Sequence, residues 1–349
     1  MPRALLPVGH RPLVSYALSW LHDTGVRTVA ICGNRDTRAL LSAHERVSPA
    51  GTVATYHEDA VPRGAAGSIR DAAFATDHTT FIVAEGAAIP NVRLVELLAS
   101  HHASGAAATV VVYNDARRQG DPAEQVPTGI YVFDRRALEL VPATGFFDIK
   151  EDLIGRLYRA GERVVAFTTS EPSARVMSPS TYLAVNGWIV EKMVAADQPP
   201  YGYTKTGECL LHRDATIDRT ATFVGPVLVA AGAHIHAGAT IVGPCSVGCD
   251  AIVHEGVVVS RSAIWRRSTV GPRAVADRSI VIDDAVVDPG ERAYAQIVNR
   301  RHARDGTLAA AQAGAAVSPR ARRPITWPRS PADIMRTVGR MLTPSTVSR

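Results

Sequence analysis

The feature that most constrains this chain is a run of large apolar residues that recur at a fixed step of six between residues 211 and 265. Ten positions share it: Leu211, Ile217, Phe223, Val229, Ile235, Ile241, Val247, Val253, Val259 and Trp265. A small or slim residue lies two places before each of the later ones, as Ala233 does before Ile235. A helix repeats about every 3.6 residues and a strand about every two, so neither gives a step of six.

A parallel β-helix built from hexapeptides does give this step, with three short strands and about 18 residues in each coil. We therefore predict a left-handed parallel β-helix over residues 207–291, in which the long residue of each hexapeptide points inward. In this register Trp265 is a core residue, whereas His234 and His236 flank Ile235 and point outward.

The N-terminal half alternates between strand-like and helix-like runs. Runs rich in Val, Ile and aromatic residues predict strands at 26–31, 52–56, 80–83, 107–113, 129–133 and 163–167. Amphipathic stretches predict helices at 12–22, 37–45, 65–75, 92–103 and 149–159. This alternation predicts a Rossmann-like α/β domain with a mostly parallel sheet and helices on both faces. A further helix is predicted at 178–193, with Ser178 as its N-cap and Pro179 in its first turn.

Length and composition divide the chain into four parts. At 349 residues it exceeds the roughly 100–200 residues of one domain. We expect an α/β domain at 1–195, a linker at 196–206, the β-helix at 207–291 and a basic, disordered tail at 292–349. The tail carries the excess of positive charge, because residues 299–349 hold ten arginines against two acids while the whole chain has a net charge of +5. The basic pI therefore says little about what the folded body binds, and we expect no nucleic-acid partner.

The sequence pattern also argues against a membrane or secreted protein and against a disulfide-stabilised one. No apolar run approaches the roughly 18 residues that cross a bilayer, and the N-terminus lacks a signal-peptide pattern. We expect no transmembrane segment and a cytoplasmic location. The four cysteines are too few and too scattered for a disulfide framework, and we expect packing thiols: Cys32, Cys209, Cys245 and Cys249.

Several local strings resemble the sugar-1-phosphate nucleotidyltransferases, in particular the mannose-1-phosphate guanylyltransferases. The strings are PRALLPVGHRPLVSYALSWL at 2–21, RGAAGSIRDA at 63–72, FIVAEGAAI at 81–89, GIYVFDRRALELV at 129–141 and STYLAVNGWIV at 180–190. The resemblance implies transfer of a nucleotidyl group from a nucleoside triphosphate to a sugar phosphate. In such enzymes, catalysis consists of positioning and of charge neutralisation by a divalent metal and basic side chains.

The resemblance also marks where this chain departs from the family. The chain begins beyond the position of the glycine-rich turn, and a mis-assigned start would explain that difference. Arg3 stands where the family has lysine, and the two metal-binding aspartates align with Ala87 and Arg175. The sugar-binding Glu-Lys-Pro string has no counterpart in residues 114–128. Glu85 offers one alternative ligand, because in an extended strand it shares a face with Ala87. With these residues, we expect the site to hold no metal. It would hold Mg²⁺ only if the chain is an active enzyme.

The remaining site residues are the candidates for a residual nucleotide or sugar-phosphate pocket: Arg3, Gly64, Ala65, Gly67, Glu85 and Gly86. The small residues at 64–67 either receive a phosphate at a helix start or let that helix pack closely on the sheet. Asp148 and Asp152 either form a carboxylate pair or, as we favour, cap a helix.

Three functions fit these observations. We favour an inactive regulatory or scaffold subunit that forms homo-oligomers or pairs with an active paralogue and retains a nucleotide-sugar ligand. An active guanylyltransferase-like enzyme is the alternative. A hexapeptide acyltransferase, with a base among His234, His236 and His254, is a second alternative.

Overall fold

The computed structural model describes residues 1–35, 37–38, 48–115, 124–170 and 173–300. They form two compact units, one of Met1–Leu6 with Arg11–Arg175 and one of Pro7–His10 with the residues from Val176 onward. Most of the helix predicted at 37–45, and the tail after residue 300, lie outside the described residues. No helix in the described part of the chain is long and apolar enough to span a bilayer.

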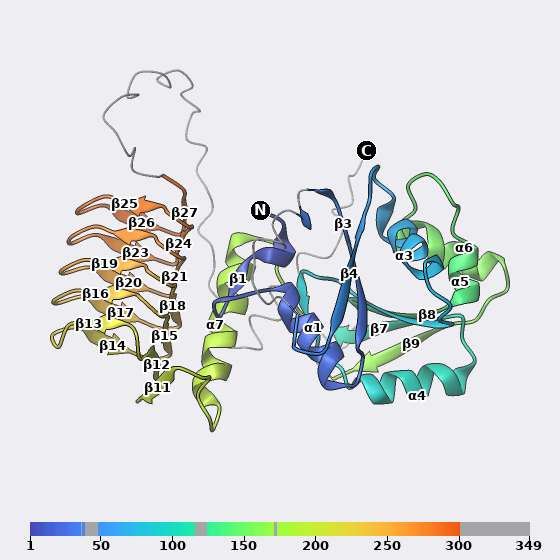
Figure 1. Cartoon of the computed structure of the whole chain (residues 1–349), viewed down its shortest axis with the longest axis horizontal. Coiled ribbons are helices and arrows are strands. Elements are labelled where there is room, and N and C mark those ends of the chain that lie inside the picture. Colours follow the sequence, from blue (N-terminus) through green and yellow to red (C-terminus); the bar gives the residue numbers. More distant parts are fainter. Residues whose placement is uncertain (36, 39–47, 116–123, 171–172, 301–349) are drawn as a thin grey trace, which may run out of the picture. The chain divides into compact units, whose positions relative to one another are not determined.

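The first unit is an α/β domain (Figure 1). Its strands are β2 (Arg11–Pro12), β3 (Thr28–Gly33), β4 (Val53–Glu58), β5 (Thr80–Ala84), β6 (Ala88–Ile89), β7 (Ala108–Asp115), β8 (Glu124–Asp134), β9 (Val164–Thr169) and β10 (Ala174–Arg175). Its helices are α1 (Val14–Asp23), α3 (Gly64–Phe74), α4 (Leu94–Ser104), α5 (Arg135–Glu139) and α6 (Ile154–Arg159), with single turns η1 (Arg3–Leu5) and η2 (Ile149–Leu153).

The main sheet of this unit has the order β5-β8-β7-β9, and β3 pairs with β4 in a separate two-stranded sheet. Strands β7 and β9 are parallel, as are β3 and β4, but β8 is antiparallel to both of its neighbours. The sheet is therefore mixed: β5, β7 and β9 run in one direction and β8 in the other, so the expectation of a mostly parallel sheet holds for three of its four strands. The connection at 116–123 is shorter than the dozen or so residues that a parallel crossover needs, so β8 returns beside β7 in the opposite direction.

Helices cover both faces of this sheet, as predicted. Successive residues of β8 alternate between two apolar clusters because strand side chains alternate in direction. Ile130 and Val132 pack with α1 and α4, whereas Tyr131 and Phe133 pack with α3, α5 and the η2–α6 segment.

The second unit contains a parallel β-solenoid of three sheets. One sheet consists of β11 (Tyr203–Thr206), β12 (Cys209–His212), β15 (Val227–Val229), β18 (Cys245–Val247), β21 (Ala263–Ile264), β24 (Ile280–Val281) and β27 (Ile297–Val298). The second consists of β13 (Thr216–Ile217), β16 (His234–Ile235), β19 (Ile252–Val253), β22 (Thr269–Val270) and β25 (Val286–Val287). The third consists of β14 (Thr222–Val224), β17 (Thr240–Val242), β20 (Val258–Ser260), β23 (Val275–Asp277) and β26 (Arg292–Tyr294). The predicted hexapeptide solenoid is thus confirmed, and its strands continue past residue 291.

Coil length changes part-way along the solenoid. Leu211 pairs with Val229 and Val229 with Val247, so these coils keep the length of three hexapeptides. The next partner of Val247 is Ile264 in place of Trp265, which makes that coil one residue shorter, and the following coils keep the shorter length. The six-residue step therefore ends at Val259, and the prediction that Trp265 points into the core is wrong. Ile264 takes the inward position and is 1% exposed.

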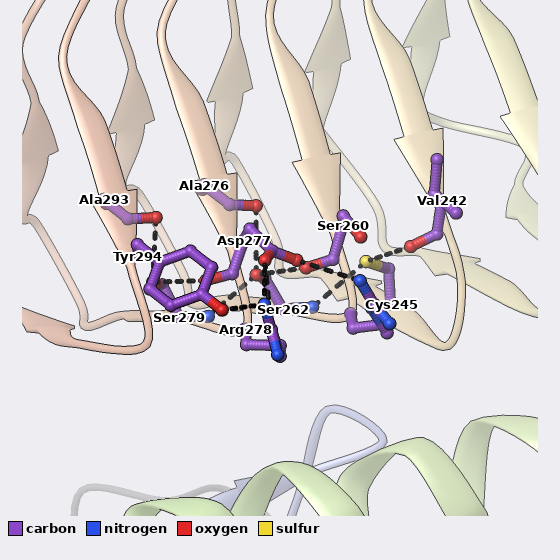
Figure 2. Close-up of polar contacts among 11 residues, drawn as sticks. Val242, Cys245, Ser260, Ser262, Ala276, Asp277, Arg278, Ser279, Ala293 and Tyr294 are labelled. Atoms are coloured by element: carbon purple, nitrogen blue, oxygen red, sulfur yellow. Dashed lines mark hydrogen bonds and ion pairs between the residues drawn. The ribbon is translucent and has the colours of Figure 1, made fainter. Parts of the chain in front are cut away.

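Hydroxyl groups fill the shortened corners (Figure 2). The longer coils turn through Gly-Pro at 225–226 and 243–244, whereas the next two turn through Arg-Ser at 261–262 and 278–279. Ser262 Oγ lies 2.7 Å from the Ser260 carbonyl and accepts a hydrogen bond of 2.9 Å from the Ser279 N–H. The Cys245 thiol accepts from the Ser262 N–H at 3.2 Å, so Cys245 belongs to this packed corner.

Helix α7 (Pro179–Ala195) belongs to the same unit as the solenoid. Ser178 caps it as predicted, because its side chain accepts the Thr181 N–H while the Thr181 hydroxyl accepts the Ser178 N–H. Val190 and Val194 pack against Leu210 and Leu228 on the outer face of the first sheet.

Polar contacts extend this packing. The Tyr182 hydroxyl donates to the Pro7 carbonyl at 2.6 Å and lies 2.8 Å from Trp265 Nε1, which donates to it. The outward Trp265 is thus held by an edge-on contact with Tyr182. Asn186 bridges the Gly9 N–H and the Ser246 hydroxyl, each at 3.0 Å.

His10, at the end of the segment that begins with β1 (Pro7–Val8), makes a testable contribution to acid stability. Its backbone is left-handed (φ 67°), its Nε2 is buried without a partner in the described chain, and burial lowers the pKa of His10 to about 4. The unfolded chain, with an ordinary pKa of about 6.5, therefore binds more protons between about pH 4 and 6.5. Stability should be full above pH 6.5 and fall by up to about 3 kcal/mol as the pH drops toward 4.

The His10→Asn variant checks this prediction, because asparagine tolerates the left-handed backbone and does not titrate. Urea unfolding at several pH values should show a smaller loss of stability below pH 6.5 in the variant than in the parent. Parallel pH curves for the two proteins would contradict it.

Candidate functional site

The two positions where the resemblance predicts metal-binding aspartates, Ala87 and Arg175, lie close together. Strands β6 and β10 form an antiparallel pair in which Arg175 is opposite Ala88, the neighbour of Ala87. Ala87 is 8% and Arg175 7% exposed. The fold therefore brings together two residues that are far apart in sequence. The side chain of Ala87 is a methyl group and that of Arg175 is a cation, so neither can bind a metal.

Glu85 follows β5 and forms an ion pair with Arg175 through Oε2 and Nη2. The side chain of Arg175 is 9% exposed and that of Glu85 is 34% exposed. Residues 86–87 form a turn, so the extended strand that would place Glu85 and Ala87 on one face is absent there. The carboxylate of Glu85 is engaged by a cationic side chain of the protein.

Arg175 has more hydrogen-bonding capacity than the described residues satisfy. A guanidinium carries five N–H donors. Its Nε and Nη1 atoms are buried and have no hydrogen-bond partner in the described part of the chain. Only Nη2 contacts the carboxylate.

Two residues of β8 complete the surroundings of this pair. The Glu85 N–H donates to the Gly129 carbonyl at 2.9 Å, and Gly129 has a left-handed backbone (φ 86°). Tyr131, two residues on, is buried, and burial raises the pKa of its hydroxyl to about 12, an effect that Arg175 opposes and Glu85 reinforces. Tyr131 is thus a neutral neighbour of the ion pair.

Gly129 holds the pair in place by having no side chain. A Cβ there would lie 2.8 Å from Glu85 Oε2 and 3.2 Å from Glu85 Cβ. We expect Gly129→Ala to lower the free energy of unfolding by about 1–3 kcal/mol through the backbone strain and the displaced carboxylate. Urea unfolding followed by circular dichroism measures this.

Gly145→Ala is the matched control. Gly145 has the same φ of 86°, but no atom lies within 4 Å of the position of its Cβ. The difference between the two variants isolates the contact with Glu85, and equal losses would show that only the backbone conformation matters.

Gly86 and Arg3 lie in one neighbourhood. A Cβ on Gly86 would lie 3.3 Å from the Cβ of Ala4, the residue that follows Arg3 in the η1 turn. Arg3 itself is exposed. The structure thus places the predicted pocket residues Arg3, Glu85 and Gly86 near the end of β5.

The start of α3 has a structural explanation. The N–H groups of Ala66 and Gly67 donate to the Phe147 carbonyl at 3.1 and 3.3 Å, and a Cβ on Gly64 would lie 2.5 Å from that oxygen. Gly64, Ala65 and Gly67 therefore begin a helix whose first donors are partly occupied by the protein. This geometry favours the close-packing interpretation over phosphate binding.

Buried Arg63 fixes this loop against α3. It pairs with Asp71 at 2.7 Å and donates to the carbonyls of Pro142 and Gly145. Asp148 likewise serves structure: it accepts the Lys150 N–H at 2.7 Å, while its own N–H donates to Asp152. The capping interpretation of Asp148 and Asp152 is confirmed.

A divalent metal does not fit the residues at this site. No cluster of three or more His, Cys, Asp or Glu side chains that could hold a metal ion occurs among the described residues. Ala87 has no ligand atom, Arg175 is a cation, and the carboxylate of Glu85 is paired with Arg175.

The solenoid histidines lie on its outer surface, as predicted. His234 and His236 are exposed, and the His236 ring stacks on that of His254 with centroids 5.1 Å apart. The acidic neighbour of His254 is Glu255, at 3.8 Å, whose side chain is itself 58% exposed. This open, solvated arrangement does not favour a general base.

Comparison with known proteins agrees with the fold and with the resemblance. Residues 1–186 match the family described as "MobA-like NTP transferase domain". The chain belongs to this family. It is also similar to mannose-1-phosphate guanylyltransferase of Mycobacterium tuberculosis (strain ATCC 25618 / H37Rv), with 23% identity over 253 residues that cover 66% of this chain and 70% of the relative. The predicted resemblance to sugar-1-phosphate nucleotidyltransferases is confirmed.

Proposed function

We propose that this NTP transferase family member does not catalyse nucleotidyl transfer and acts as a regulatory or scaffold subunit with a retained ligand pocket. The observation that supports this is the Glu85–Arg175 ion pair, which puts a buried cation where the resemblance expects a metal-binding carboxylate.

The loss of rate expected from the missing groups favours an inactive protein. A triphosphate reaction needs its developing negative charge neutralised, and losing one preorganised stabilising group costs about 3–4 kcal/mol, a factor of roughly 10²–10³ in rate. Here Ala87 and Arg175 replace both expected ligands, and the bound ion would be the largest local charge. Such losses are not additive, but each one alone is severe.

The proposed ligand is a nucleotide sugar or one of its phosphate-bearing parts. The M. tuberculosis relative is named a mannose-1-phosphate guanylyltransferase. We therefore take GDP and mannose 1-phosphate as the first ligands to test. The candidate contacts are Arg3 and the residues around Glu85 and Gly86, whereas the start of α3 contributes mainly packing.

The proposed assembly uses the solenoid. Stacked coils offer extended faces for contact with another subunit. We propose a homo-oligomer, or a complex with an active paralogue, in the cytoplasm. Light scattering after size exclusion, and co-purification of a tagged chain from its source cells, test the two forms; a monomer that brings down no homologue would refute both.

Turnover tests the catalytic part of the proposal. Purified protein should release no pyrophosphate above background from GTP and mannose 1-phosphate in the presence of Mg²⁺. The same assay with the other nucleoside triphosphates and with glucose 1-phosphate guards against a wrong choice of substrate. Metal-dependent release of pyrophosphate by the parent, at a rate that changes in the Arg175→Gln variant, would show that the protein is an active enzyme. That result would refute the proposal.

A further inference from the structure

Arg175, which is paired with Glu85, has the features of a binding site for a further anion. Arg175 is charged and almost fully buried, yet Nε and Nη1 have no partner among the described residues. Unpaired buried donors are costly, and charged ones more so. A state in which an additional acceptor meets this guanidinium would remove that cost.

Glu85 is the partner that can leave. Its side chain is 34% exposed, against 9% for Arg175, and it lies just after a strand end, next to the 86–87 turn. Gly129 offers it a close-fitting surface but no polar side chain. The carboxylate can therefore turn into solvent, where water solvates it, while the arginine stays inside.

The two unpartnered nitrogens are buried. A ligand that displaces the carboxylate from Nη2 takes its place at the guanidinium, next to these two nitrogens. Phosphate is the anion that suits such a site, because its several oxygens match the planar, forked donors of arginine.

We infer that Arg175 supplies, from within the chain, the positive charge that a divalent cation supplies in a catalytic relative, so that a phosphate-bearing ligand binds here without metal and in competition with Glu85. This inference rests on the proposed function, since it assumes that the pocket still receives a nucleotide or a sugar phosphate. It assigns Arg175 to binding and Glu85 to the role of an internal competitor.

Isothermal titration calorimetry of the full chain tests the inference, with GDP and mannose 1-phosphate as separate probes. Each titration is run in EDTA and in excess Mg²⁺. We expect GDP, mannose 1-phosphate or both to bind in EDTA, and Mg²⁺ to raise the affinity by no more than about threefold, because the site has its own cation. The two probes show whether the nucleotide or the sugar carries the recognised phosphate.

Two substitutions then assign the roles. Arg175→Gln should weaken binding about tenfold or more, since a charged hydrogen bond is lost, and Arg175→Lys should restore part of it. Glu85→Gln should strengthen binding, because the competing charge is removed while the shape is kept. Arg93→Gln is the matched control: Arg93 is 83% exposed and pairs with Glu96 on α4.

Three results would overturn the inference. The first is an affinity for the probe that rises more than about threefold when Mg²⁺ is added. The second is an Arg175→Gln variant that binds like the parent while its circular dichroism and melting curve are unchanged. The third is a parent protein that binds neither probe. The last result leaves the proposed lack of catalysis standing, whereas pyrophosphate release in the turnover assay would remove that proposal without deciding how the phosphate is bound.

Discussion

Replacing Ala87 and Arg175 together by aspartate is expected to give the site affinity for a divalent ion that the parent lacks. The double change restores the two carboxylates that the family resemblance places there, and Glu85, released from Arg175, becomes a third acidic group nearby. Hard cations such as Mg²⁺ and Mn²⁺ are bound by one or two carboxylates together with substrate phosphates. Electron paramagnetic resonance of Mn²⁺ should show about tenfold or more increase in bound ion, and GDP binding should become metal-dependent.

The Arg175→Gln single variant is the control for this experiment, because it frees Glu85 without adding a ligand. If the double variant stays folded by circular dichroism but binds no more Mn²⁺ than the single one, the aligned positions are not a former metal site. The resemblance would then not extend to residues 87 and 175.

Truncation of Ile241 to alanine is expected to lower the free energy of unfolding of the solenoid by about 2–5 kcal/mol. Ile241 is 0% exposed and packs inside the coil between Phe223 and Val259, its partners in the adjacent strands. The truncation leaves a cavity that cannot close easily, because the strands above and below fix the backbone in register. Urea unfolding followed by the strand signal in circular dichroism gives the value.

Val224→Ala is the matched control. Val224 lies one residue from the inward Phe223 on the neighbouring strand, but its own side chain is 52% exposed. We expect a change within about 0.5 kcal/mol for it. Equal effects at both positions would mean that the six-residue register has been misassigned.

The sequence predicted the solenoid well wherever its corners are uniform. The step of six holds through Val259, where the corners read Gly-Pro, and fails where Arg-Ser takes over at 261–262. The second Arg-Ser, at 278–279, comes one residue sooner than three hexapeptides would place it and was a visible sign of the shorter coil. Trp265 was misplaced because it lies six residues after Val259, where a corner of unchanged length would put the next inward residue.

The α/β unit was predicted in its elements but not in the direction of β8. Element type follows local periodicity, whereas strand direction depends on the length of the connection at 116–123. The predicted strands at 107–113 and 129–133 leave fifteen residues between them, enough for a parallel crossover. Only the longer strands of the structure, which end at Asp115 and begin at Glu124, shorten the connection below that limit.

The candidate site was predicted only in outline. The resemblance located Ala87 and Arg175, but the pairing of Arg175 with Glu85 joins residues 90 positions apart and is visible only in three dimensions. Gly129 and Tyr131 were not singled out, because their importance lies in what they border. The small residues at 64–67 suggested a ligand, and only the Phe147 carbonyl shows what they contact.

The shortened corners show how a β-solenoid can tolerate a change in coil length. Because the corner absorbs the missing residue, the strands that follow keep their faces: Ile264, Val281 and Val298 continue the inward column of Val247. Trp265, next to Ile264, lies on the outer face and donates to Tyr182 on α7. Deletion of a single codon at such a corner should therefore leave the inward and outward residues of every later strand unchanged.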